Sequence, residues 1–187
     1  MPERAGRVAQ RLLAEDMWSG WGIRTLSERH PAYNPFSYQC GSVWPHDNAI
    51  IAAGLRRYGL DQEAARVARA IFDAAERFQN LRLPELFAGL PRDAAGFPIQ
   101  YLGANVPQAW AAGAVIQLLD ALLGLDPDAT NHLLHLHPAL PAWLEAIAVE
   151  NLTVGGSAVD LQLRRSADGG YSLDVTRRRG SLEIAQD

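Results

Sequence analysis

The hydrophobic pattern of the chain changes its period near Val149, and this change limits the folds that the chain can adopt. Before that residue, apolar side chains recur every three or four positions, as in residues 62–78, which is the spacing of a helix with one face in water. After it, apolar and polar side chains alternate, as in residues 159–164, which is the pattern of a half-buried strand. Glycine pairs such as Gly155–Gly156 provide the turns between strands. The sequence therefore predicts a mainly α chain that ends in a small antiparallel β-sheet.

Four segments have helical patterns, and two of them differ in a way that indicates layers. Helices are expected at residues 3–15, 47–58, 62–78 and 107–123. Residues 62–78 keep charged side chains on one face, whereas residues 107–123 are apolar on nearly all sides, which is typical of a helix buried all round. A long loop joins these two segments. We therefore expect a two-layer helical array whose outer helices meet water and whose inner helices do not.

Composition and charge narrow the classes of protein to which the chain can belong. The net charge is -4 and the sequence pI is about 5.7, so a nucleic-acid partner is not expected. Cys40 is the single cysteine, which excludes an internal disulfide and a cysteine-based zinc site. The most apolar run, residues 109–116, is too short to span a bilayer, and no apolar stretch follows the charged N-terminal residues as it does in a signal peptide. These features predict a soluble, cytoplasmic protein with no membrane partner.

Residues 17–46 are irregular but rich in aromatic side chains. Glycines and prolines interrupt this stretch repeatedly, so regular structure is not expected there. The same stretch contains three Trp, two Tyr and one Phe. A solvated linker has no use for such side chains. This aromatic loop, as we call residues 17–46, is therefore expected to pack against the rest of the protein or to bind a ligand.

The pentapeptide from Trp44 to Asn48 stands where the aromatic loop meets a predicted helix. Two interpretations of it are open. One is a simple helix start, because Pro45 favours the backbone angle of a first helical turn and Asp47 balances the helix dipole. The other is a polar cluster at a helix N-terminus, beside an indole that can stack on a sugar ring. A metal site is not expected, because His46 and Asp47 lack a second pair of ligands.

Glu85 is a carboxylate among apolar neighbours, in the segment LPELFAG. Most lone carboxylates in loops are simply solvated, and that interpretation is open here. The apolar neighbours argue against free exposure, however. A carboxylate in such surroundings can have a raised pKa and can serve in proton transfer.

Two further segments invite a functional interpretation. Residues 98–110 look like a loop that enters the fourth helix, with Trp110 expected in the core and Gln108 facing a cavity at the helix end. Three histidines lie in a connector rich in leucine and proline, and we interpret them as structural rather than as metal ligands. They are His132, His135 and His137.

Four segments resemble, in the same order, the C-terminal part of the amylo-alpha-1,6-glucosidase, or glycogen-debranching, family. They are SGWGIRTLS at 19–27, YNPFSYQCGSVWPHDNAIIAAGLRRYG at 33–59, PELFAG at 84–89 and PQAWAAGA at 107–114. The block that contains WPHDN is long enough to be specific. The resemblance implies a six-hairpin (α/α) toroid, inverting hydrolysis of α-glucosidic bonds, and no metal or other cofactor.

The resemblance also implies roles for individual residues. Glu85 is similar to the general base that activates water, and Trp44, His46 and Asp47 are similar to residues that bind glucose. Further candidates for substrate binding are Trp21, Tyr38, Tyr101 and Gln108.

The resemblance implies an incomplete active site as well. Inverting glycosidases need two carboxyl groups about 6.5–9.5 Å apart, one acid and one base. In related six-hairpin hydrolases the acid is an aspartate of an earlier hairpin, and four or five helices are expected here against twelve in a full toroid. We therefore expect residues 1–147 to be a partial toroid and residues 148–187 a β appendage. The chain would then be a fragment, a truncated reading frame or half of a split enzyme.

The expected partners follow from this incompleteness. They are an α-glucan or oligosaccharide substrate, the missing N-terminal half, or further copies of the chain, because an uncovered inner helix is apolar and drives association. A non-catalytic sugar-binding or scaffold module descended from such an enzyme is the alternative function. A metal-dependent hydrolase that uses Asp47 and the histidines is the least favoured.

Overall fold

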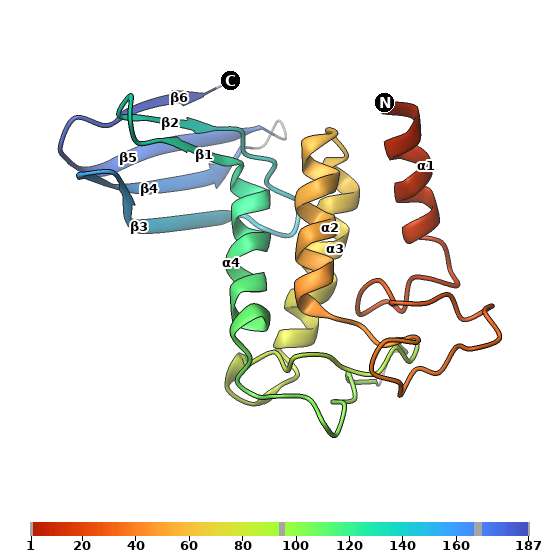
Figure 1. Ribbon diagram of the computed structural model, residues 1–187. Coiled ribbons are helices and arrows are strands. Elements are labelled where there is room, and N and C mark those ends of the chain that lie inside the picture. The colour runs from red at the N-terminus through yellow and green to blue at the C-terminus, as the bar shows by residue number, and fades with distance from the viewer. Residues whose placement is uncertain (1, 94–95, 167–169, 187) are drawn as a thin grey trace. The chain divides into compact units, whose positions relative to one another are not determined.

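The structure is a computed structural model that describes residues 2–93, 96–166 and 170–186. Its helices are α1 (Pro2–Leu12), α2 (Pro45–Arg57), α3 (Asp61–Ala75) and α4 (Ala109–Leu123), with a short 3-10 helix, η1, at Gln79–Leu81 (Figure 1). The four predicted helices are therefore confirmed, with their ends displaced by a few residues. Among the described helices, none has the length and apolar character needed to cross a membrane.

The strands form two three-stranded sheets (Figure 1). In one sheet, β3 (Ala146–Val154), β4 (Ser157–Arg165) and β5 (Tyr171–Arg179) are antiparallel neighbours in that order. This confirms the small sheet predicted near the end of the chain. In the other, β2 (Leu133–Leu136) pairs antiparallel with β1 (Leu125–Asp128) and parallel with β6 (Glu183–Gln186). The sequence pattern does not reveal this second sheet, because strands of four residues are too short for alternation to be recognised.

Contacts within the chain divide it into two compact units, Met1–Leu119 and Asp120–Asp187. The second unit has its own core, in which leucines and valines of β2 and β4 pack together. The most deeply buried of them are Leu134, Leu136, Val159, Leu161 and Leu163. The division predicted from the resemblance, 1–147 and 148–187, separates part of a catalytic domain from a β appendage. The division by contacts does not test it, so it stays a prediction. The described helices agree with a mainly α chain, and the toroid also stays a prediction.

The burial of α4 differs from the expectation that this helix is enclosed on every side. One face is buried, through residues such as Ala111, Ala114 and Leu118. The opposite face is exposed, and Ile116 shows 67% of its surface to solvent. The prediction was wrong because an apolar side chain does not ensure that a neighbouring element covers it, and the described residues cover only one side of α4.

α2 and α3 form a helical hairpin around Gly59. This glycine has a φ of +71°, and its N–H donates to the carbonyl of Arg56 at 2.9 Å, a helix ending that glycine adopts without steric cost. α3 then buries Val67 and Ile71 and exposes Arg66. The predicted amphipathic character of this helix is thus confirmed.

Short β-bridges hold the aromatic loop against the segment that contains Glu85. Arg24 pairs with Val43, Val43 with Phe87, and Phe87 with Gln100, all antiparallel. The backbones of Val43 and Phe87 exchange two hydrogen bonds, of 2.9 and 3.0 Å. Segments far apart in the sequence therefore lie side by side, as expected of a loop that packs against the protein.

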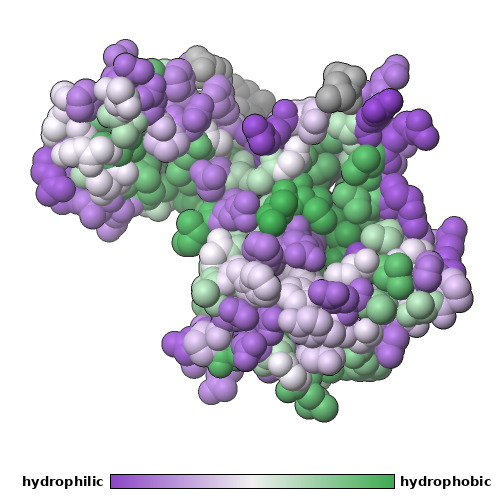
Figure 2. Space-filling view, in the orientation of Figure 1, coloured by the Kyte–Doolittle hydropathy of each residue, from purple (hydrophilic) through white to green (hydrophobic). Residues whose placement is uncertain are grey.

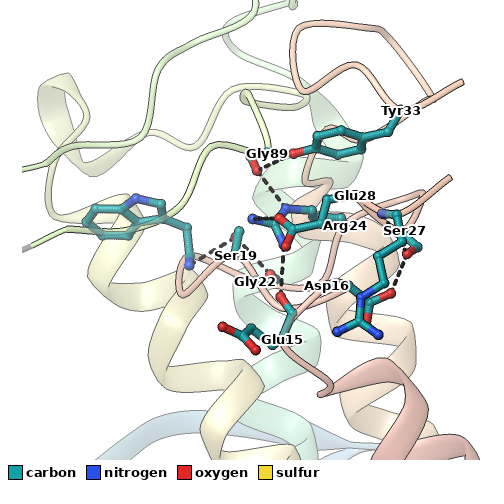
Figure 3. A network of polar contacts seen from close by, with 11 residues as sticks. Glu15, Asp16, Ser19, Gly22, Arg24, Ser27, Glu28, Tyr33 and Gly89 are labelled. Atoms are coloured by element: carbon teal, nitrogen blue, oxygen red, sulfur yellow. Dashed lines mark hydrogen bonds and ion pairs between the residues drawn. The ribbon is translucent and has the colours of Figure 1, made fainter. Parts of the chain in front are cut away.

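A buried arginine ties several loop segments together (Figure 3). Arg24 Nε donates to the carbonyl of Gly89 at 2.7 Å, and its Nη1 donates to the carbonyl of Glu15 at 3.2 Å. Its Nη2 lies 3.4 Å from the carboxylate of Glu28. Tyr33 Oη donates to the same Gly89 carbonyl at 3.1 Å. Because a buried charge is costly unless it is paired and hydrogen-bonded, these contacts explain how Arg24 can be only 2% exposed.

Candidate active site

A cavity of about 490 Å³ lies where the aromatic loop meets the first turns of α2 and α4, a size that suits a small ligand. Its lining residues are Thr25, Tyr38, Gln39, Trp44, His46, Asp47 and Trp110. Four of them are substrate-binding candidates from the sequence, namely Tyr38, Trp44, His46 and Asp47. The structure therefore brings these candidates together, and it adds Thr25, Gln39 and Trp110, which the sequence did not single out for substrate binding.

Aromatic rings form much of the cavity wall. The ring centroids of Trp44 and Trp110 are 5.9 Å apart at an interplanar angle of 72°, and the imidazole of His46 stacks on Trp110 at 5.1 Å and 21°. Trp44 is fixed, because only 5% of it is exposed and its Nε1 donates to the carbonyl of Tyr38 at 3.0 Å. Trp110 is 42% exposed, so its expected place in the core is corrected. It lies on the half-exposed first turn of α4 and offers an indole surface to the cavity.

The first turn of α2 is positioned by Asn48, which is fully buried. Its Oδ1 accepts the N–H of Ile23 at 2.8 Å, and its Nδ2 donates to the carbonyls of Ile23 and Trp44 at 3.2 and 2.9 Å. α2 itself begins at Pro45, as a simple helix start requires. The two interpretations of the pentapeptide are compatible, because the same helix start brings the side chain of His46 to the cavity.

His46 and Asp47 provide the polar part of the cavity wall. Their side chains are 33% and 52% exposed, and His46 Nδ1 lies 3.5 Å from Asp47 Oδ1. Both side chains can therefore reach a ligand without first breaking a buried contact. Hydroxyl groups of a sugar can donate to the carboxylate of Asp47 and can bond to the imidazole.

Glu85 lies behind this wall, and only 4% of it is exposed. Tyr38 Oη donates to Glu85 Oε1 at 2.6 Å. On the other side, the side-chain amide and the backbone N–H of Asn105 donate to Glu85 Oε2 at 3.0 and 3.3 Å. The Glu85 N–H donates in turn to the Asn105 carbonyl at 3.1 Å. The carboxylate is thus held at both oxygens, and the interpretation of Glu85 as a simply solvated carboxylate is wrong.

These hydrogen bonds favour the ionised form of Glu85. Donation by Tyr38 lowers the pKa of the carboxyl most, burial raises it, and donation by Asn105 lowers it further, so that the pKa lies below its ordinary value. The sequence suggested a pKa raised by apolar neighbours. That expectation is corrected, because bonds to the ionised form outweigh the cost of burying it.

Tyr38 joins Glu85 to the cavity. The phenol lines the cavity and bonds Glu85, whereas Glu85 is not itself among the cavity-lining residues. The ring of Tyr38 also lies 4.8 Å from that of Trp44 and 5.9 Å from that of Tyr101. The phenol of Tyr38 therefore lies between Glu85, the candidate base, and the cavity where a ligand would bind.

Three other candidates for substrate binding do not line the cavity: Tyr101, whose ring contacts that of Tyr38, and Trp21 and Gln108, which lie elsewhere. Trp21 is 2% exposed, and the guanidinium of Arg92 covers its ring at 4.3 Å. Gln108 accepts the N–H of Ala109 at 2.8 Å through its Oε1, at the start of α4. The assignment of all three to substrate binding stays a prediction. Across the described ranges, no group of three or more metal-ligating side chains comes together.

Comparison with known families bears on this site. Residues 1–89 match the model of a family described as the mannosylglycerate hydrolase MGH1-like glycoside hydrolase domain. This part of the chain is similar to a glycoside hydrolase. The matched residues include the aromatic loop, the first turn of α2 and Glu85, and the match supports a glycoside hydrolase family of the six-hairpin type. No curated protein matches the chain.

Replacing Tyr38 by Phe is expected to raise the pKa of Glu85. The phenol donates to the ionised carboxylate and so stabilises that form, and without it the proton binds at higher pH. As the pH is lowered, Glu85 should therefore become protonated at a higher pH in Tyr38→Phe than in the unaltered chain. Carboxyl carbon shifts in an NMR titration of both proteins measure this, and identical Glu85 titration curves would contradict it. Tyr171→Phe, on β5, is the matched control.

Proposed function

We propose that this chain contributes the general base and part of the sugar-binding site of an inverting α-glucosidase of the amylo-alpha-1,6-glucosidase type. The observation that carries the proposal is the pairing of an aromatic cavity with a buried carboxylate that favours the ionised form, joined through Tyr38. A general base must be ionised before it can take a proton, so the lowered pKa of Glu85 suits the role. The match to a glycoside hydrolase family adds independent support.

In this proposal each part of the cavity has a task. A glucose ring stacks on the exposed indole of Trp110, because aromatic faces are apolar surfaces that suit the C–H face of a sugar. Asp47 and His46 bind its hydroxyl groups and fix its orientation. Tyr38 yields its place at Glu85 Oε1 to a water, which the carboxylate deprotonates as the water attacks the anomeric carbon. A second carboxyl group, to which we assign no described residue, protonates the leaving oxygen.

The family that the chain matches suggests a second candidate substrate, a mannosylglycerate. Its glycerate carboxylate calls for a cation in the binding site. Among the described residues that line the cavity, none is Arg or Lys, and Asp47 brings a negative charge. His46 is the single side chain there that can become cationic. The cavity therefore favours a neutral glucoside over an anionic one.

The proposal is tested by titrating the chain with panose, an α-1,6-linked glucoside, and with mannosylglycerate. Panose should change the tryptophan fluorescence more strongly and at lower concentration, because it stacks on Trp110. Trp110→Ala should lose this response, whereas Trp143→Ala, in the other compact unit, should keep it. If neither sugar changes the tryptophan fluorescence, the proposed site is wrong.

Activity distinguishes the hydrolase from the alternative, a non-catalytic sugar-binding module. With the active enzyme, proton NMR of the first glucose released from panose should show the β-anomer, because inverting hydrolysis of an α-bond changes the configuration. Initial release of the α-anomer would contradict an inverting mechanism. Binding without any hydrolysis would favour the sugar-binding module.

A further inference from the structure

A second cavity lies away from the sugar site, in the groove between α1 and α2. It has a volume of about 320 Å³. Most of the residues that line it are apolar: Ala5, Val8, Leu12, Ile51, Gly54, Leu55, Tyr58 and Leu60, with Arg4 at the same place. Figure 2 shows apolar surface in the hollow between the two helices that Figure 1 labels. We call this feature the α1–α2 groove.

The groove lacks a covering element among the described residues. Val8 and Tyr58, on its two sides, are each 55% exposed. α1 has 11 residues, and an isolated helix of that length is only marginally stable in water. Contiguous apolar surface of this kind marks a site of association. The helix therefore gains stability from whatever fills the groove.

The charge at the groove limits what can fill it. Arg4 lines the groove, and an adjoining cavity shares Arg4 and Val8 and adds Arg7 and Arg11. Arg11 is paired with Asp16 at 2.6 Å, whereas Arg4 and Arg7 have no ion-pair partner in the described part of the chain. Two grooves that faced each other would bring these cations together, at a cost in free energy. The occupant should instead carry a carboxylate beside an apolar surface.

The exposed face of α4 has this character. Ala112, Ile116 and Asp120 are spaced four residues apart and all are exposed, so that they form one ridge along the helix. Ile116 is 67% exposed, and its neighbour Gly113 leaves room for a close approach. α4 contains no Lys or Arg, and Asp120 is its one acidic residue. The ridge is therefore apolar with a carboxylate at one end.

We propose that the ridge of α4 in one copy of this chain docks into the α1–α2 groove of a second copy. Ile116 enters the groove between Val8 and Tyr58, and Asp120 approaches the guanidinium of Arg4 or Arg7. The two surfaces are different patches of one chain, so the contact is head-to-tail and builds rings or open chains. It uses no residue of the sugar site and does not rest on the proposed function.

Cysteine cross-linking tests the geometry. Cys40 is replaced by Ser, and Val8→Cys and Ile116→Cys are made in separate proteins. The mixture of the two proteins should form a disulfide-linked dimer under mild oxidation, and neither protein alone should do so. A dimer of the Val8→Cys protein alone would overturn the proposal in favour of groove-to-groove pairing, and the absence of any cross-link in the mixture would overturn it outright.

Sedimentation velocity tests the contact without cysteines. The unaltered chain should associate as its concentration rises, and Ile116→Glu should weaken association by about tenfold or more, because it places a carboxylate in the apolar groove. Arg4→Glu should also weaken association, and the double variant Arg4→Glu with Asp120→Arg should restore it. These positions are exposed, so circular dichroism should show unchanged folding. An unaltered chain that stays monomeric at every concentration would end the proposal.

Discussion

Replacement of Glu85 by Gln is expected to lower the rate of glycoside hydrolysis by about 10²–10⁴-fold, the usual contribution of a general base. Gln has nearly the size of Glu but cannot take a proton from water. Its amide still accepts the phenol of Tyr38, so the cavity wall keeps its shape. Substrate affinity should therefore change little, and steady-state kinetics on the active enzyme should show the loss in kcat rather than in KM.

Controls separate catalysis from folding. The side-chain NH2 of Gln would face the two N–H donors of Asn105, so two hydrogen bonds and some stability are lost. Thermal unfolding of Glu85→Gln should therefore be measured alongside its rate. Glu28→Gln is the matched variant, because Glu28 is also a carboxylate of a loop but contacts Arg24 rather than the cavity. It should keep its rate. If Glu85→Gln keeps normal turnover, Glu85 is not the base and Asp47 becomes the candidate.

Replacement of Gly89 by Ala is expected to lower the free energy of unfolding by about 3 kcal/mol or more. A Cβ at this position would lie 1.7 Å from the carbonyl oxygen of Gly41, which is a backbone atom and cannot rotate away. The backbone of Gly89 cannot easily move either. Its N–H donates to the carbonyl of Pro35, and its own carbonyl accepts from Arg24 and Tyr33 (Figure 3).

Gly54→Ala is the control for this prediction. Gly54 lies inside α2, and apart from its chain neighbours and the backbone of its own helix no atom stands within 4 Å of the place that a Cβ would take. Alanine should therefore stabilise the chain there, by about 0.5–1 kcal/mol, because it favours the helix. Urea unfolding of both variants measures the two changes. A Gly89→Ala protein as stable as the unaltered chain would show that the segments around Gly41 and Gly89 are not in close contact.

The catalytic and sugar-binding interpretations differ in what they require of Glu85. A module that only binds sugar needs the cavity wall, which Trp44 and Trp110 supply. It has no need of a buried ionised carboxylate behind that wall. Glu85 accepts three hydrogen bonds, one from Tyr38 and two from Asn105, and this buried, hydrogen-bonded carboxylate favours the catalytic role.

The sequence alone determined the helices and the main sheet of this protein. Their periods are local properties, because a helix or strand of nine or more residues repeats its pattern often enough to be recognised. α3 and β4 are clear examples, and so is Gly59, which ends α2 by its own conformational freedom. The WPHDN block and Glu85 were also marked by the sequence, through the family resemblance.

Only the tertiary structure decided which faces of these elements are buried and in which direction the pKa of Glu85 shifts. The one-sided burial of α4 depends on which neighbours it has, and no pattern in residues 109–123 records that. The pKa of Glu85 depends on Tyr38 and Asn105, which lie 47 and 20 residues away in the chain. The bridges of Val43 and Phe87 bring them together. Burial alone predicts a raised pKa for Glu85. The hydrogen-bond donors that lower this pKa come from distant parts of the sequence, so they reach the carboxylate only in the folded chain.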